Sequence, residues 1–110
     1  MSVYFMTAKA KPLLDNFKAR IAQTEAKGKI TTWEVEENGD FTHKAADWTE
    51  KAWFRPAVMS DRLRFDVVWP ADQQRPVPVY AYYHGHLIET FVNHFENELT
   101  LASATPPKRS

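Results

Sequence analysis

The sequence contains no cysteine and only three glycines among its 110 residues. Without cysteine, the chain can form no disulfide, thiolate metal site or iron–sulfur cluster, and it has no cysteine nucleophile. Each glycine has a predicted structural role: Gly28 ends a helix, Gly39 makes a turn and Gly85 joins a strand to a helix. None is left for a phosphate-binding loop or a dinucleotide-binding fingerprint, and the sequence predicts no cofactor.

The chain also lacks an excess of either charge, because 14 basic residues balance 14 acidic ones. Nucleic-acid binders usually carry a basic surplus, since phosphate contacts supply much of their affinity, so nucleic-acid binding is not expected. Long apolar runs are missing too, and the chain begins with only a short one, Val3–Met6. The sequence therefore predicts no signal peptide and no membrane span, and the default expectation is a cytoplasmic protein.

Aromatic residues are plentiful, at 14% of the chain within a hydrophobic content of 44%. A chain of this length fits one domain and can bury a core without disulfides. Residues 1–99 are predicted to form a single α+β domain. Residues 100–110 include Pro106-Pro107 and few apolar groups, so they are predicted to be a disordered tail.

A segment with helical spacing follows a short first strand predicted at Val3–Met6. Apolar or small residues recur on one stripe: Ala10, Leu13, Leu14, Phe17, Ile21 and Thr24. Pro12 suits the first turn of a helix, and Gly28 supplies the left-handed residue that commonly ends one. The pattern predicts an amphipathic helix that begins near Ala10 and ends at Gly28.

Residues 30–45 predict a hairpin with two possible registers. A two-residue loop would place Glu36 opposite Phe41. A three-residue loop, with Gly39 as its bulge glycine, places Val35 opposite Phe41 and Trp33 opposite His43. The second register keeps the apolar residues on one face, and a buried face specifies register strongly, so we expect the three-residue loop.

A second hairpin is predicted to join residues 51–58 to residues 62–69. Pro56 cannot donate to a strand ladder, which places its strand at an edge or a bulge. Alternating residues over 77–84 then predict a last strand, and Gly85 is expected to turn the chain into a closing helix. That helix carries the apolar stripe Leu87, Ile88, Phe91, Val92, Phe95 and Leu99.

The predicted order is β-α-β-β-β-β-β-α, a two-layer α+β fold. Its antiparallel sheet has five to six strands and packs against an N-terminal and a C-terminal helix. The order of strands within the sheet stays open at this stage. It is also open whether both helices cover one face or one helix covers each.

Tyr80 and Tyr82 would protrude from the last predicted strand, near Val68 of a neighbouring one. If both helices cover the opposite face, these residues form an exposed patch of the kind that contacts a partner. If one helix covers each face, the tyrosines belong to the core. The leading hypothesis is a non-enzymatic binding or assembly module that forms a homodimer through this sheet face.

The alternative hypothesis is a small-ligand protein or enzyme with a pocket between the closing helix and the sheet. Trp33, Trp69 and Tyr83 would line the pocket, and His43 or His94 would supply a polar group. No catalytic residue is assigned.

The segment His84-Gly85-His86 could contribute two metal ligands, but zinc normally needs three or four from the protein. The others would have to come from residues such as His43 or Glu89. A strand-end histidine and an exposed helix-start histidine explain the same pattern without a metal, so no metal site is predicted.

Overall fold

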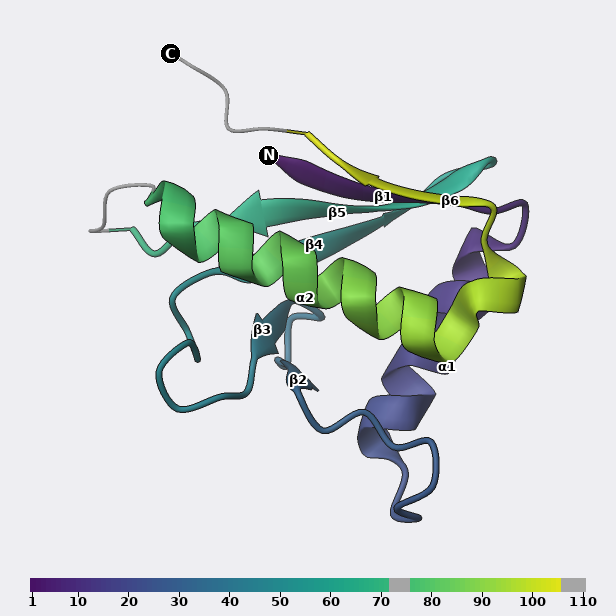
Figure 1. Ribbon diagram of the computed structural model, residues 1–110, viewed down its shortest axis with the longest axis horizontal. Coiled ribbons are helices and arrows are strands. Elements are labelled where there is room, and N and C mark those ends of the chain that lie inside the picture. The colour runs from purple at the N-terminus through teal and green to yellow at the C-terminus, as the bar shows by residue number, and fades with distance from the viewer. Residues whose placement is uncertain (72–75, 106–110) are drawn as a thin grey trace.

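The computed structural model describes residues 1–71 and 76–105, and six strands within these ranges form one antiparallel sheet. The elements in chain order are β1 (Ser2–Met6), α1 (Ala10–Ala22), β2 (Trp33–Val35), β3 (Phe41–His43), β4 (Trp53–Val58), β5 (Arg62–Val68), α2 (Val77–Phe95), a 3₁₀ turn (Glu96–Glu98) and β6 (Leu101–Ala104). The strand order is β2-β3-β4-β5-β1-β6 (Figure 1). The α+β class, with an antiparallel sheet and two amphipathic helices, is confirmed.

The register predicted for the first hairpin is confirmed, and the second hairpin is present as β4 and β5. Trp33 lies opposite His43 and Val35 opposite Phe41, and the loop between β2 and β3 contains Gly39 at φ +90°. Trp53 pairs with Val68 at the open end of the β4–β5 hairpin. Strand β3 pairs with β4 only at Phe54, so Pro56 lies in a part of β4 that has one neighbouring strand. This is the edge position that its missing N–H requires.

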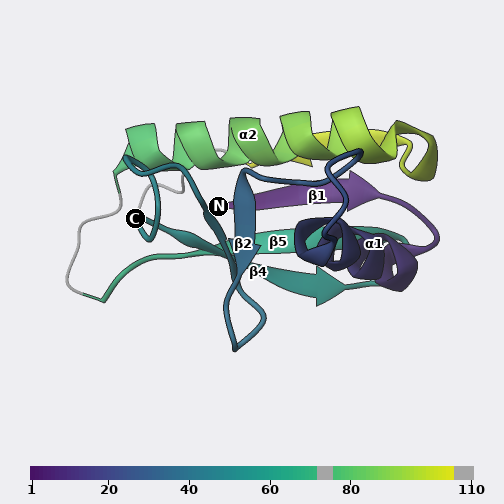
Figure 2. The same ribbon diagram turned by 90° about the horizontal axis from the view of Figure 1, so that it is seen from below.

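Both helices cover the same face of the sheet. Side chains of β1 alternate, so that Val3 and Phe5 are buried while their neighbours point to the other face. Phe17 of α1 meets Phe65 of β5 edge-to-face, and Phe91 of α2 stacks on Phe5. In Figure 2, α1 overlies β4 and β5, whereas α2 runs along the β1 side. The opposite face of the sheet is left without a helix by the described residues.

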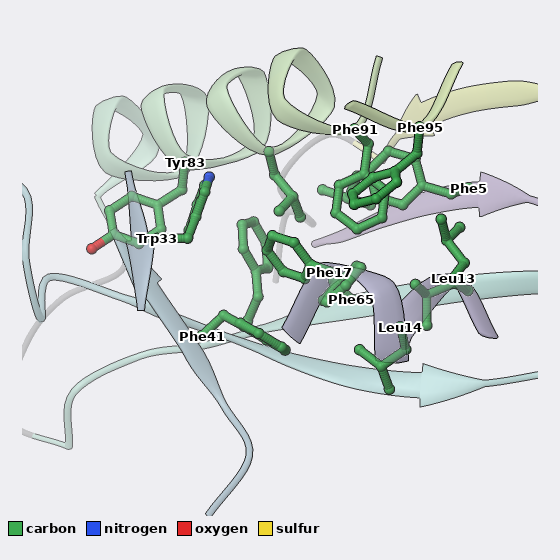
Figure 3. Packing of buried hydrophobic residues seen from close by; sticks show 14 of the residues in the cluster. Phe5, Leu13, Leu14, Phe17, Trp33, Phe41, Phe65, Tyr83, Phe91 and Phe95 are labelled. Atoms are coloured by element: carbon green, nitrogen blue, oxygen red, sulfur yellow. The ribbon is translucent and has the colours of Figure 1, made fainter. Parts of the chain in front are cut away.

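An aromatic cluster fills the space between the sheet and the helices (Figure 3). The rings of Phe5 and Phe91 stack with centroids 4.1 Å apart, and Phe17 lies 4.8 Å from Phe91. Phe41 brings β3 to the same cluster, 4.6 Å from Phe17. The core therefore depends on rings from both helices and from strands far apart in the sequence.

The predicted strand over residues 77–84 is wrong, because these residues form the first turns of α2. Tyr80, Tyr83 and Leu87 fall on one buried face at helical spacing, and Pro78 sits in the first turn, where it breaks no helical hydrogen bond. Gly85 lies inside α2 rather than before it. The chain then adds β6 after the helix, so the observed order is β-α-β-β-β-β-α-β.

The predicted disordered tail is also wrong over residues 101–104, which pair with β1 as β6. The Thr105 N–H donates to the Ser2 carbonyl at 2.9 Å and continues this pairing. The rest of the predicted tail, residues 106–110, lies outside the described residues. Strand β1 thus has a neighbour on both sides, and β6 becomes an edge of the sheet.

Helix α1 ends at Ala22, six residues before the glycine expected to end it. The Lys29 ammonium donates to the carbonyls of Ile21 and Gln23 and so satisfies the C-terminal end of the helix. Gly28, at φ +77°, serves the turn that follows. Neither α1 nor α2 is long and apolar enough to cross a membrane, and the described residues contain no other candidate.

Candidate functional site

Tyr80 is buried rather than exposed, at 2% accessibility. Its hydroxyl donates to the Thr105 carbonyl at 2.8 Å and lies 3.1 Å from the Ser2 carbonyl. Burial raises the pKa of this hydroxyl, which keeps it a donor. The prediction of an exposed Tyr80 is therefore wrong, because the side chain points from α2 into the sheet. Its role is to hold the end of β6 against β1.

Tyr82 is half-buried on another side of α2, where its ring stacks on Trp48 at 3.8 Å and on His86 at 4.1 Å. Val68 lies on the uncovered sheet face, opposite Trp53. The predicted sheet patch of Tyr80, Tyr82 and Val68 is therefore not assembled. The error follows from reading a helical segment as a strand.

The structure brings together three of the five residues predicted for a pocket. Trp33 lies 5.1 Å from His43 and 5.7 Å from Tyr83, measured between ring centroids. Trp33 and Tyr83 are fully buried, and the Trp33 indole N–H donates to Thr90 Oγ1 at 3.0 Å. They pack as core residues whose polar atoms are satisfied internally. Trp69 is half-buried against the core.

His94 lies apart from this group, near the C-terminal end of α2. Burial and the nearby Arg20 lower its pKa.

Two surface hollows are found elsewhere in the described part of the chain. One is lined by Glu36, Glu37, Asn38, Glu50 and Trp53, and the other by residues around the start of α1 and by the 3₁₀ turn and the loop before β6.

The histidines do not fit a metal site. His84 and His86 are two residues apart on α2, so their side chains point about 200° apart around the axis. His86 instead lies 5.2 Å from His43. His43 Nδ1 accepts the Ala45 N–H at 3.1 Å, which leaves the proton on Nε2, where a metal ion would need a lone pair. Among the described residues, no three metal-ligating side chains gather.

The uncovered sheet face mixes polar and apolar residues, and its arginine charges are compensated. Its arginines each pair with a carboxylate: Arg55 with Asp40, Arg62 with Asp61 and Arg64 with Asp66. The Ser2 hydroxyl also donates to Asp66 at 2.6 Å. The arginines of this face are therefore held by neighbouring carboxylates.

Strand β6 is a four-residue edge strand that carries neither a charged residue nor a proline. Natural edges are kept from pairing by shortness, charged side chains or proline. The opposite edge, β2, has three residues and carries Glu34, and the free part of β4 carries Pro56. Strand β6 has the sequence Leu-Ala-Ser-Ala, without charge or proline. Its outer side is free of any strand from the described residues.

The backbone of β6 offers a regular row of hydrogen-bonding groups on this outer side. Thr105 directs its N–H inward, to the Ser2 carbonyl. Because antiparallel ladders alternate between inward and outward residues, Ser103 also faces β1, while Ala102 and Ala104 direct their N–H and C=O groups outward. These two alanines supply four unpaired backbone groups that another strand could meet.

Small and apolar residues also lie on the side of α2 that faces away from β3. Tyr80 and Phe91 face β1, and Tyr82 lies on the side of α2 that faces β3. The flank of α2 farthest from β3 comprises Ala81, Gly85, Ile88 and Val92, which recur at helical spacing. We call these four residues the outer flank of α2. Ala81, Gly85 and Val92 are exposed and Ile88 is half-buried.

No protein family, curated protein or solved structure matches the chain. The features that bear on function are therefore those of the structure itself. The β6 edge and the outer flank of α2 were both missed from the sequence, because one was assigned to a tail and the other to a strand.

Gly85 has no evident structural task within the chain. A Cβ atom built on it meets nothing within 4 Å, and its φ is not positive. Glycine inside a helix costs about 0.5–1 kcal/mol relative to alanine. We expect Gly85→Ala to raise the free energy of unfolding by about this amount. Urea denaturation of the two proteins measures it, and a loss of stability would show that the space at Gly85 is already used.

Proposed function

We propose that this chain is a protein-binding module that adds an extended segment of a partner polypeptide to its sheet at β6. The observation that carries the proposal is the uncharged, proline-free edge, with the outward groups of Ala102 and Ala104. Exposed edges of this kind serve as docking sites in strand-addition complexes, where main-chain hydrogen bonds supply affinity. The binding or assembly role expected from the sequence is retained, and its surface moves from the sheet face to the sheet edge.

An extended segment fits this edge better than a second copy of the chain. Helix α2 contacts both β1 and β6 on the covered side of the sheet. Two copies that paired their β6 strands antiparallel would bring both α2 helices to the same side of one joined sheet. Helices pack with about 8–10 Å between their axes, so two copies joined in this way would also have to fit their α2 helices against each other. A partner segment without a helix of its own has no such requirement.

Substitution of Ala104 by proline tests the proposal. Proline removes the outward N–H of residue 104 and leaves the inward bond from Thr105 to Ser2 in place. The probe is a blocked hexapeptide that alternates valine and threonine, followed by the amide chemical shifts of the ¹⁵N-labelled protein. We expect the Ala102 and Ala104 amides of the unsubstituted protein to shift and become protected from exchange. Ala104→Pro should weaken binding by about tenfold or more.

The melting temperature of Ala104→Pro serves as the control for folding, and Ala104→Gly serves as a matched variant that keeps the N–H. Binding that survives Ala104→Pro, or peptide shifts confined to other strands, would remove β6 as the docking edge. Sedimentation without peptide tests whether a second copy of the chain occupies the edge instead. A concentration-dependent dimer that Ala104→Pro dissociates would identify a second copy as the occupant and overturn the proposed partner.

A further inference from the structure

We infer that the segment bound at β6 carries a large apolar side chain opposite Leu101, on the uncovered face of the sheet. This inference rests on the proposed function and adds the source of its selectivity. Main-chain pairing at β6 accepts any sequence, so selectivity has to come from the side chains that lie beside the added strand.

The pleat of β6 fixes which of its side chains lie on the uncovered face. Leu101 pairs with Met6 of β1. Phe5, the residue before Met6, is fully buried and stacks on a ring of α2, so it points to the covered face. Successive residues of a strand point to opposite faces, which places Met6 and Leu101 on the uncovered face. Ser103, two residues after Leu101, lies on the same face.

Leu101 and Ser103 are also the positions at which the side chains of an added strand come closest. Their N–H and C=O groups face β1, because the outward groups of this strand are those of Ala102 and Ala104. A strand that continues the antiparallel pairing of the sheet meets Leu101 in a non-hydrogen-bonded pair, in which the Cα atoms are about 4.5 Å apart rather than about 5.5 Å. A side chain opposite Leu101 is therefore held in contact with it.

The surface around Leu101 is apolar. The Leu101 side chain is 56% exposed, and its cross-strand neighbour Met6 and its diagonal neighbour Tyr4 are half-buried. We call Leu101, Met6 and Tyr4 the edge patch. The Arg62 guanidinium lies over the Tyr4 ring, 5.7 Å from its centroid. Apolar groups thus gather at the rim of the sheet, where an apolar side chain of the added segment covers the exposed part of Leu101.

A charged side chain opposite Leu101 gains no ion pair from the row of paired residues behind it. This row runs inward from Leu101 through Met6 to Arg62 on β5. Arg62 is already paired with Asp61 at 3.0 Å. Three strand spacings, about 14 Å in all, separate β5 from a strand added at β6. The edge patch therefore favours an apolar side chain over a charged one.

Two blocked hexapeptides test the inference, one that alternates valine with threonine and one that contains threonine alone. Valine and threonine are both β-branched and differ by a methyl group in place of a hydroxyl, so the two peptides offer matched backbones. We expect the valine peptide to bind about fivefold more tightly, as for one favourable cross-strand pair. Nuclear Overhauser contacts should connect the valine methyl groups to Leu101 and Met6.

Leu101→Thr removes the apolar contact and keeps a residue that favours strands. We expect this variant to bind both peptides with equal affinity, and its melting temperature checks that it is folded. Val58→Thr is the matched control, because Val58 is an apolar residue of β4 with a similar exposure of 47%. This substitution should leave the preference for the valine peptide unchanged.

Three results would overturn the inference: equal affinity of the unsubstituted protein for both peptides, a preference that survives Leu101→Thr, or valine contacts confined to Ala102 and Ala104. The proposed function would still stand in these cases, provided that Ala104→Pro weakens binding of the peptides. If neither peptide binds at millimolar concentration, the proposed function fails and the inference fails with it.

Discussion

Phe91→Ala is expected to lower the free energy of unfolding by about 3–5 kcal/mol, the range for removing a buried phenylalanine ring. Phe91 is fully buried and connects the two layers of the fold. It stacks on Phe5 of β1 and lies 4.8 Å from Phe17 of α1 and 5.7 Å from Phe65 of β5. These rings come from three elements, so the cavity left by alanine cannot close by a shift of one of them.

A loss of this size is severe because domains of this kind are stable by only about 5–15 kcal/mol. Urea denaturation followed by tryptophan fluorescence measures it. Val92→Ala is the matched control on the neighbouring residue, which is half-exposed and should change stability by less than about 1 kcal/mol. Equal effects of the two substitutions would contradict the assignment of Phe91 to the centre of the core.

Acidification from pH 7 to pH 4 is expected to remove about 3 kcal/mol of stability through His43 alone. Burial, together with the neighbouring His86, lowers the pKa of His43 from 6.5 to about 4. The Ala45 N–H adds to this, because it faces Nδ1 and would oppose a second proton there. His43 Nε2 is buried without a hydrogen-bond partner among the described residues, so the ring sits among aromatic neighbours in its neutral form.

The sign follows from the two protonation states. Between pH 4 and 6.5 the unfolded chain binds a proton at His43 and the folded chain does not, so stability falls as the pH falls through this window. Above pH 6.5 His43 is neutral in both the folded and the unfolded chain, and its full contribution to stability is present. The measurement is urea denaturation at several pH values, with His43→Phe as a ring of similar size that does not titrate. An acid slope that is the same in both proteins would contradict the role given to His43.

The first two-thirds of the fold could be predicted because local patterns and tertiary packing agree there. The β2–β3 register followed from one rule, that Trp33 and Phe41 must share a buried face, and the structure has both at 1% exposure or less. Leu63 and Phe65 alternate with Arg62 and Arg64, which left no other assignment for β5.

Residues 77–84 could not be assigned correctly because their pattern fits two periods. Apolar and aromatic residues occur at nearly every position, so a strand reading and a helix reading both find a buried stripe. Gly85 favoured a break, although an exposed glycine and a proline in the first turn, such as Pro78, are both compatible with a helix. Only the packing of Tyr80, Tyr83 and Leu87 against the sheet decides between them.

The candidate site depends on the same two segments, which is why the sequence did not reveal it. Alanine and serine have low strand propensity, and β6 is a strand because β1 offers it an unpaired side and Tyr80 holds its end. The outer flank of α2 becomes recognisable only once residues 81–92 are known to be one helix. Neither feature has a local signal strong enough to stand without the tertiary structure.

The pairing of β1 with β6 also has a consequence for the order in which the protein is made. Strand β1 is synthesised first of the described strands and β6 last, and the Ser2 N–H bonds to Thr105 Oγ1 across 103 positions. During translation one side of β1 therefore stays unpaired until β6 has been made, and Val3 and Phe5 stay exposed until α2 packs on them. A ribosome-bound or prematurely ended chain would expose β1 to neighbouring chains, whereas the completed protein presents the short, neutral strand β6 in its place.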